Sequence, residues 1–406
     1  MTLTAQSVHS ADKQTVSSRP NRIASIDILR ALTMVLMIFV NDLWSLTNIP
    51  GWLEHTTADQ DGMGLADVVF PAFLFIVGMS IPFAVNNRRK KGDTDLQVVG
   101  HILIRAGALL VMGVFLVNGE NINEAATGMP RLLWNTLCCI SFILIWNAYP
   151  STAKRWLVTG AKVLGFATLL TLAFMYRGGD GETLDRFSTY WWGILGLIGW
   201  AYLIGSLIYT FLGKNLTAMV VSWFVLMSLS MASQAGIVPS GYTGPLGNGS
   251  LAALTMGGIV ISMIYLHFKD RNAEKKMLLI IGSIAALLFV AGFYTNRFWI
   301  IAKLGATPPW VLLCSGLTVV AFIFIYWLAD MKGKAQWFDF IKPAGTNTLL
   351  CYLMPYFSYA VVRVVGIHWP EFMLDGGVGL LKSFLFALLC VVITGWLGKR
   401  GVQLKL

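Results

Sequence analysis

Twelve long apolar runs, separated by short polar segments, constrain the fold of this chain more than any other feature. A helix that crosses the hydrocarbon core of a bilayer needs about 20 mostly apolar residues. Such runs lie near 23–43, 66–86, 98–118, 131–149, 156–176, 190–212, 215–233, 250–268, 277–294, 306–329, 344–365 and 377–398. The sequence therefore predicts an all-α, polytopic transmembrane helical bundle of about 12 spans, or about 10 if the two tightest pairs of runs each form a single span.

The charge content excludes a soluble globule. Only 12% of the residues are charged, whereas a soluble domain carries roughly 25%. The net charge of +10 comes from short basic clusters between apolar runs, without a basic face interleaved with aromatic residues, so we expect no nucleic-acid partner. The five cysteines all lie inside apolar runs without a CxxC pair, and they predict neither a disulfide framework nor a metal site.

The loops alternate in charge and predict the orientation. The segments 45–65, 119–130 and 233–249 contain no Lys or Arg. Basic residues gather in the alternate segments: Arg88, Arg89, Lys90, Lys91, Lys154, Arg155, Lys214, Lys269, Arg271, Lys275, Lys276, Lys332, Lys334, Lys342, Lys399 and Arg400. By the positive-inside rule both termini are cytoplasmic. We expect residues 1–22 to form a disordered cytoplasmic tail and residues 23–400 to form one transmembrane domain.

Ionisable residues inside the runs are site candidates, because an unpartnered charge is costly in lipid. Asp27 and Arg30 can pair on the first span, and Asn41 returns to nearly the same face about 16 Å further along the axis from Arg30. His101 and Arg105 lie one turn apart on the third span and would suit a phosphate. The alternatives are an ordinary anchor pair, an interfacial Asn, and an Arg that reaches back to the interface.

The first outer segment gathers one histidine among carboxylates. A neutral imidazole such as His55 beside carboxylates is a candidate general base. The alternative is a solvated histidine in a loop that is acidic only because basic residues are kept inside. Asp67 would favour a helix start, where the dipole stabilises an anion. The carboxylates are Asp42, Glu54, Asp59, Asp61 and Asp67.

Two ordered motifs carry a resemblance. The first runs from Arg22 through Asp27 and Arg30 to Asn41, and the second is the run 64–81, Gly-Leu-Ala-Asp-Val-Val-Phe-Pro-Ala-Phe-Leu-Phe-Ile-Val-Gly-Met-Ser-Ile. Together they resemble the heparan-α-glucosaminide N-acetyltransferase family, most closely over residues 22–86. Weaker similarities lie at 306–310 and 345–352.

The resemblance implies a transmembrane acetyltransferase that takes acetyl-CoA from the cytosol and acetylates the amine of an amino sugar, of glucosamine type, on the far side. It implies that His55 is catalytic, with Asn41 beside it and Asp67 as the acid of the second motif. The chain departs from the family pattern, because His55 and Asp67 are twelve residues apart and no Trp-Asn-Gly follows the histidine. We expect the chain to lack the large outer domain that lysosomal members carry before the first shared span, and this expectation favours a bacterial inner-membrane relative.

These expectations combine into one hypothesis. The coenzyme would bind near Asp27, Arg30, His101 and Arg105, and Asn41 would orient the thioester. The residues expected to hold an amino-sugar or oligosaccharide acceptor are Asp42, Glu54, Asp59 and Asn347. The expected partners are acetyl-CoA, the acceptor and membrane lipid, with a homodimer as an option. The alternatives are a small-molecule or sugar transporter or flippase, and an O-acyltransferase of a polysaccharide.

Overall fold

The computed structural model describes residues 23–179, 183–239, 244, 246–269 and 273–406. The predicted tail, residues 1–22, lies outside these ranges. Over the described ranges the chain is helical, and strand-like pairing is limited to isolated bridges.

Twelve apolar helices account for most of the described chain. They are α1 (Ala24–Asp42), α2 (Leu65–Lys90), α3 (Asp95–Glu120), α5 (Arg131–Trp146), α6 (Arg155–Met175), α7 (Ile194–Leu212), α8 (Leu216–Gln234), α9 (Ser250–Lys269), α10 (Glu274–Thr295), α11 (Pro308–Ile325), α13 (Thr348–Val365) and α14 (Gly376–Lys399). Within the described residues, 11 of them are long and apolar enough to cross a membrane, and α5 is shorter. The predicted fold class is confirmed: the chain is a multi-pass helical membrane protein.

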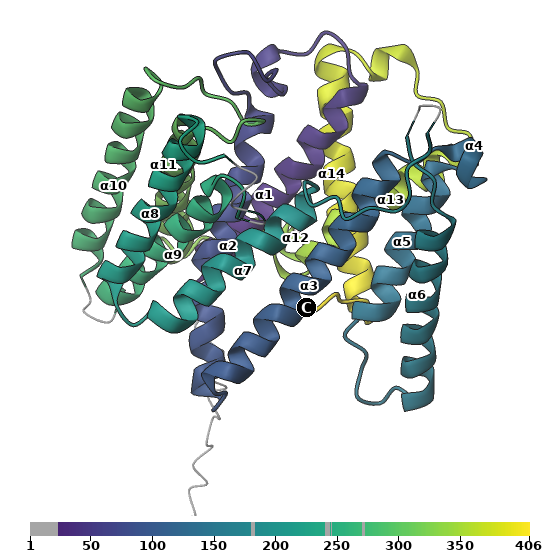
Figure 1. Ribbon diagram of the computed structural model, residues 1–406, viewed down its shortest axis with the longest axis horizontal. Helices are drawn as coiled ribbons and strands as arrows, with labels where there is room; N and C mark the ends of the chain where they lie inside the picture. Colours follow the sequence, from purple (N-terminus) through teal and green to yellow (C-terminus); the bar gives the residue numbers. More distant parts are fainter. Residues whose placement is uncertain (1–22, 180–182, 240–243, 245, 270–272) are drawn as a thin grey trace, which may run out of the picture.

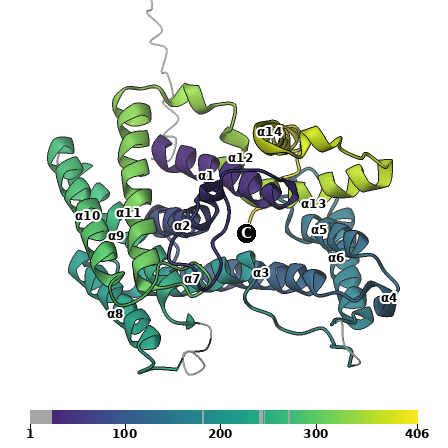
Figure 2. The same cartoon turned by 90° about the horizontal axis from the view of Figure 1, so that it is seen from above.

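Helices α1 and α2 lie between two groups of helices (Figure 1). Helices α8 to α11 cover one side, and α3, α5, α6, α13 and α14 lie on the other, as the view from above also shows (Figure 2). The short α12 (Lys342–Thr346) packs beside α1. The pairs α2–α9, α3–α7 and α10–α11 make the most extensive contacts.

Glycines allow α2 and α9 to touch backbone to backbone. A Cβ atom at Gly78 would lie 1.9 Å from the carbonyl oxygen of Thr255, and one at Gly258 would lie 1.9 Å from that of Phe75. Small residues permit this approach in membranes, where helices associate through close packing rather than through the hydrophobic effect. The contact holds α2, which carries Asp67, firmly against α9.

The two described ends of the chain lie at one end of the bundle. The backbone N–H of Ala24 donates to Asp330 at the end of the α11 segment. The side chain of Asn347, which precedes α13, donates to the carbonyl of Val402 and accepts from the N–H of Leu404. Because α1 begins at this end, the segment that joins α1 to α2 lies at the opposite end.

Candidate active site

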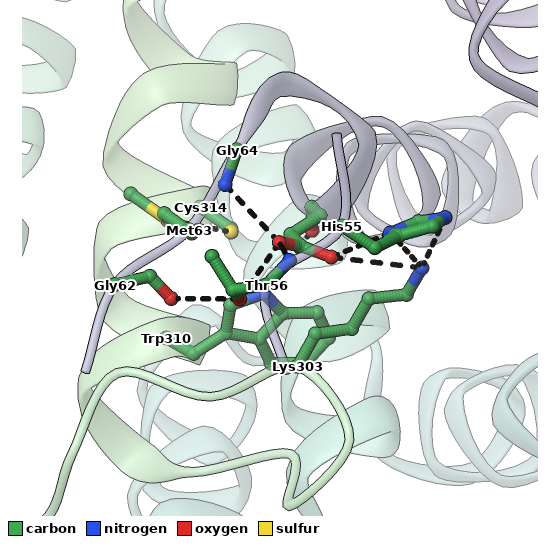
Figure 3. A network of polar contacts seen from close by, with 9 residues as sticks. His55, Thr56, Gly62, Met63, Gly64, Lys303, Trp310 and Cys314 are labelled. Atoms are coloured by element: carbon green, nitrogen blue, oxygen red, sulfur yellow. Dashed lines mark hydrogen bonds and ion pairs between the residues drawn. The ribbon is translucent and has the colours of Figure 1, made fainter. Parts of the chain in front are cut away.

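His55 lies in the segment between α1 and α2, just after a 3-10 turn, Gly51–Leu53. Its ring nitrogen Nδ1 is 2.7 Å from Oδ1 of Asp67 (Figure 3). The His55 side chain is 48% exposed, whereas the Asp67 side chain is 1% exposed. One edge of the imidazole is therefore held by a buried carboxylate, while the rest of the ring remains open to a substrate.

The carboxylate of Asp67 is surrounded by donors. Its Oδ2 accepts from the backbone N–H of Thr56 at 3.0 Å and from that of Gly64 at 3.1 Å. The Thr56 hydroxyl lies 3.0 Å from the same Oδ2 and 3.2 Å from the Gly62 carbonyl, so its single proton serves one of them at a time. Asp67 is also the third residue of α2, where the helix dipole favours an anion. These contacts favour the ionised carboxylate.

The contact with Asp67 determines which nitrogen of His55 carries the proton. An ionised carboxylate can only accept hydrogen bonds, so Nδ1 must be the donor. The lone pair is then on Nε2. In this tautomer His55 is equipped to take a proton from a substrate, and Asp67 would stabilise the imidazolium that forms.

Local backbone contacts hold this loop in place. A Cβ at Gly64 would lie 1.9 Å from the carbonyl oxygen of Glu54, so only glycine lets the chain pass here and present its N–H to Asp67. The N–H of Gly62 donates to the carbonyl of Ile301 at 3.0 Å, and the N–H of Ile301 donates to Oδ1 of Asp61 at 2.8 Å. Asp61 thus joins the His55 loop to the segment before α11.

A proline and a tryptophan link the second motif to the weaker similarity at 306–310. Pro71 has no N–H, so within α2 it cannot donate to the carbonyl four residues earlier, which is that of Asp67. The indole Nε1 of Trp310 donates to this carbonyl at 3.1 Å. Trp310 is itself buried near the start of α11. The weak similarity at 306–310 therefore packs directly against the second motif.

Lys303 also lies at this site, although no motif in the sequence predicts it. Its Nζ lies 3.1 Å from Nδ1 and 3.5 Å from Nε2 of His55, and 3.9 Å from Oδ1 of Asp67 (Figure 3). Burial lowers the pKa of Lys303, and the charge of Asp67 partly opposes this effect. The His55 loop alone contains no cation. Only the position of Lys303 in a short segment at the end opposite the basic clusters could have singled it out.

Three other predicted site residues at this end of the bundle are exposed and make no hydrogen bond to His55 among the described residues. Asn41 is exposed near the end of α1, and Glu54 and Asp59 are exposed in the loop. A hydrogen bond with the side chain of Thr57 lowers the pKa of Asp59. No hydrogen bond in the described part of the chain joins these three side chains to His55.

The carboxylate of Asp42, a predicted acceptor contact, is bound by three side chains of the protein. Its buried carboxylate lies 3.1 Å from Nζ of Lys382, and it accepts from the hydroxyls of Tyr359 at 2.8 Å and Ser383 at 2.7 Å. These partners belong to α13 and α14. Asp42 therefore attaches the end of α1 to these two helices.

Asn347, a predicted acceptor contact, lies far from His55 in the bundle. Both halves of its side-chain amide bind the backbone of the C-terminal segment, at the end of the bundle opposite His55. An acceptor that reacts at His55 would not contact it. Its conspicuous position in the sequence reflects the need to anchor this segment.

The residues predicted to bind the coenzyme fall into two groups. Arg30 pairs with Asp27 at 3.1 Å, donates to the carbonyl of Gly345 at 3.3 Å and contacts the hydroxyl of Ser80, so it joins α1 to α12 and α2. On α3, His101 is exposed and the guanidinium of Arg105 lies 4.8 Å from the centroid of the Tyr202 ring.

No contact described in the structure connects the Arg30 group to the α3 pair. Nor do the described residues contain a group of three or more His, Cys, Asp or Glu side chains that could hold a metal ion.

Comparisons with known proteins converge on one family over the first quarter of the chain. Residues 22–123 match the family model described as heparan-alpha-glucosaminide N-acetyltransferase, catalytic. The heparan-alpha-glucosaminide N-acetyltransferase of Mus musculus is 36% identical over 115 residues, and that of Homo sapiens is 32% identical over 107 residues.

The matched segments cover 27% and 25% of this chain, and 16% and 15% of the mouse and human proteins respectively. The resemblance predicted from two motifs is confirmed over this segment. It includes Asn41, His55 and Asp67, whereas Lys303 and Trp310 lie beyond it.

Proposed function

We propose that this chain is a transmembrane acetyltransferase that moves the acetyl group of acetyl-CoA to the amine of an amino sugar of glucosamine type. The observation that carries the proposal is the His55–Asp67 pair, at 2.7 Å and within the segment similar to the catalytic region of the N-acetyltransferases. A half-exposed imidazole held by a buried carboxylate is a suitable base for amine attack on a thioester.

The reaction needs one base and one departing thiolate. Nε2 of His55 takes a proton from the neutral amine as its nitrogen forms a bond to the thioester carbonyl carbon. The resulting oxyanion collapses, the C–S bond breaks, and the imidazolium returns the proton to the coenzyme sulfur. The products are the N-acetyl sugar and free CoA. An alternative route acetylates His55 first and then transfers the acetyl group to the amine.

The arrangement of the bundle supports transfer between the two sides of a membrane. His55 lies at the end opposite the described chain ends, and the basic segments predicted to be cytoplasmic lie with those ends. We infer a bacterial inner membrane, with the coenzyme approaching from the cytoplasm near Arg30, His101 or Arg105. Asn41 would orient the thioester, and Glu54 or Asp59 would contact the acceptor.

The test uses the full chain purified in detergent, with acetyl-CoA and glucosamine. Release of the CoA thiol should depend on the acceptor. A His55→Ala variant should lower turnover by about 10²–10⁴-fold, the usual contribution of a general base. His368→Ala is the matched control, because this exposed histidine follows α13 at the same end of the bundle.

Two results would contradict the proposal at different levels. If the unmodified chain releases no CoA with any amino sugar, the acetyltransferase assignment is wrong. If His55→Ala retains full turnover while the chain is active, the assignment of the base is wrong and the activity stands.

A further inference from the structure

Lys303 reaches His55 from a distant part of the chain. The two residues are 248 positions apart, yet Nζ lies within 3.5 Å of both ring nitrogens. The Lys303 side chain is 25% exposed. Burying most of a lysine side chain is costly unless its charge has a partner, and the ion pair with Asp67, at 3.9 Å, is longer than a hydrogen bond.

The protonation of His55 leaves donors of Lys303 unused. Nδ1 already gives its proton to Asp67, so it cannot accept one from the ammonium. In the part of the chain that the structure describes, the two nitrogens of His55 are the only atoms placed within hydrogen-bonding distance of Nζ. An ammonium has three donors. Nε2, which carries the lone pair, can accept one of them at 3.5 Å, and the others are available to a bound molecule.

The position of Nζ suits the transition state of acetyl transfer. An attacking atom must lie about 2.6–3.2 Å from Nε2 for its proton to be taken. In the tetrahedral intermediate the oxyanion and the attacking atom are bonded to the same carbon, so the oxyanion also forms close to Nε2. Nζ, 3.5 Å from Nε2, can then approach the oxyanion within the about 2.7–3.1 Å that stabilisation requires.

We propose that Lys303 is a catalytic residue whose ammonium stabilises the oxyanion formed on the acetyl carbonyl when His55 takes the proton of the acceptor. This inference rests on the proposed acetyl transfer. The carbonyl electron pair moves onto oxygen as the new C–N bond forms, Lys303 donates a hydrogen bond to that oxygen, and the pair returns as the C–S bond breaks. Lys303 itself is neither acetylated nor deprotonated.

The surroundings of Lys303 suit this role. Its ammonium faces the imidazole of His55 and the carboxylate of Asp67. The ammonium attracts an oxyanion more strongly in a low-dielectric environment than in water. Burial lowers the pKa of Lys303, and the ionised Asp67 opposes this effect and so favours the ammonium form that the proposal requires.

The first experiment compares Lys303→Met and Lys303→Arg with the unmodified chain in the CoA-release assay. Loss of an oxyanion donor typically lowers kcat by about 10²–10³-fold. We expect Lys303→Met to show this loss with little change in either KM, and Lys303→Arg to recover part of the rate. Lys342→Met, an exposed lysine at the opposite end, is the matched control.

The second experiment measures binding without turnover. A ketone analogue of acetyl-CoA mimics the ground state, and the corresponding trifluoromethyl ketone hydrates to a tetrahedral form. Lys303→Met should weaken binding of the tetrahedral analogue by at least about tenfold, a factor that corresponds to 1.4 kcal/mol. It should leave binding of the plain ketone unchanged. A lysine that only supports the loop would affect both analogues equally.

The outcomes separate the two proposals. If the unmodified chain is inactive with every amino sugar, the proposed function fails and this inference falls with it. If the unmodified chain is active but Lys303→Met keeps its kcat, or weakens both analogues alike, the inference alone is overturned. A selective loss for the tetrahedral analogue supports it.

Discussion

At the residue level, the carbonyl of Asp67 shows how the site depends on an exchange of hydrogen bonds. Pro71 removes the donor that an uninterrupted helix would supply, and Trp310 replaces it from another helix. The same residue thus holds His55 with its side chain and α11 with its backbone. An unsatisfied buried carbonyl costs about 1–3 kcal/mol, so this replacement contributes to stability as well as to positioning.

Because Trp310 replaces the donor that Pro71 removes, we expect substitutions of these two residues to have non-additive effects on the free energy of unfolding. Trp310→Phe should lower the free energy of unfolding, because the Asp67 carbonyl loses its donor. Pro71→Ala restores a backbone N–H that can reach the same carbonyl, so Trp310→Phe should cost less in this background, by about 0.5–3 kcal/mol, the range found for coupled residues. Thermal unfolding of the four proteins in one detergent measures the coupling. Strictly additive effects would show that the proline does not release this carbonyl.

The residues also show what could be read from the sequence. His55 and Asp67 were found because their motifs are contiguous and resemble a known family. Lys303 was missed because its partner is 248 positions away and only tertiary packing brings them together. The internal partners of Asp42 and Asn347 could not be predicted, because neither burial nor tertiary contacts can be seen in a sequence of polar residues between apolar runs.

At the level of elements, the twelve apolar helices agree with the predicted runs because the thickness of a bilayer sets the length of each. Their pairing was not predictable in the same way. Helices in lipid choose partners through close fit of small residues and through polar contacts. Neither determinant produces a hydropathy signal.

The close contact between α2 and α9 predicts that stability is sensitive to the size of the residue at position 78. Gly78→Ala places a Cβ against the Thr255 carbonyl, and two backbones must separate to admit it. We expect a loss of stability of about 1–3 kcal/mol, as for an overpacked core, with reduced activity because α2 carries Asp67. Gly282→Ala in α10 is the control, because nothing lies within 4 Å of its Cβ. Equal melting temperatures for the two variants would contradict the prediction.

At the level of the whole molecule, an even number of membrane-crossing helices returns the chain to the side on which it begins. The structure places the described chain ends together and the His55 loop at the other end. Transfer between a cytosolic donor and an external acceptor needs this separation. Which end faces the cytoplasm follows from the basic segments and remains a prediction.

Cysteine labelling in intact cells measures this orientation. All five native cysteines are buried, so they give a low background. Gln60→Cys introduces an exposed thiol in the His55 loop, and Ser151→Cys introduces one between α5 and α6 at the opposite end. A membrane-impermeant maleimide added outside the inner membrane should label the first and spare the second until the membrane is permeabilised. The reverse pattern would place His55 in the cytoplasm.

The site combines residues from two segments that are distant in the sequence, so a chimaera of two related proteins can take these segments from different parents. A chimaera that took its first 123 residues from one of the N-acetyltransferases that this chain resembles would acquire a foreign histidine and aspartate, but it would keep Lys303 and Trp310 from this chain. The base and the cation would then come from different parents. Such hybrids would separate the proposed base from the proposed oxyanion donor, and the compatibility of the two loops would limit which hybrids are active.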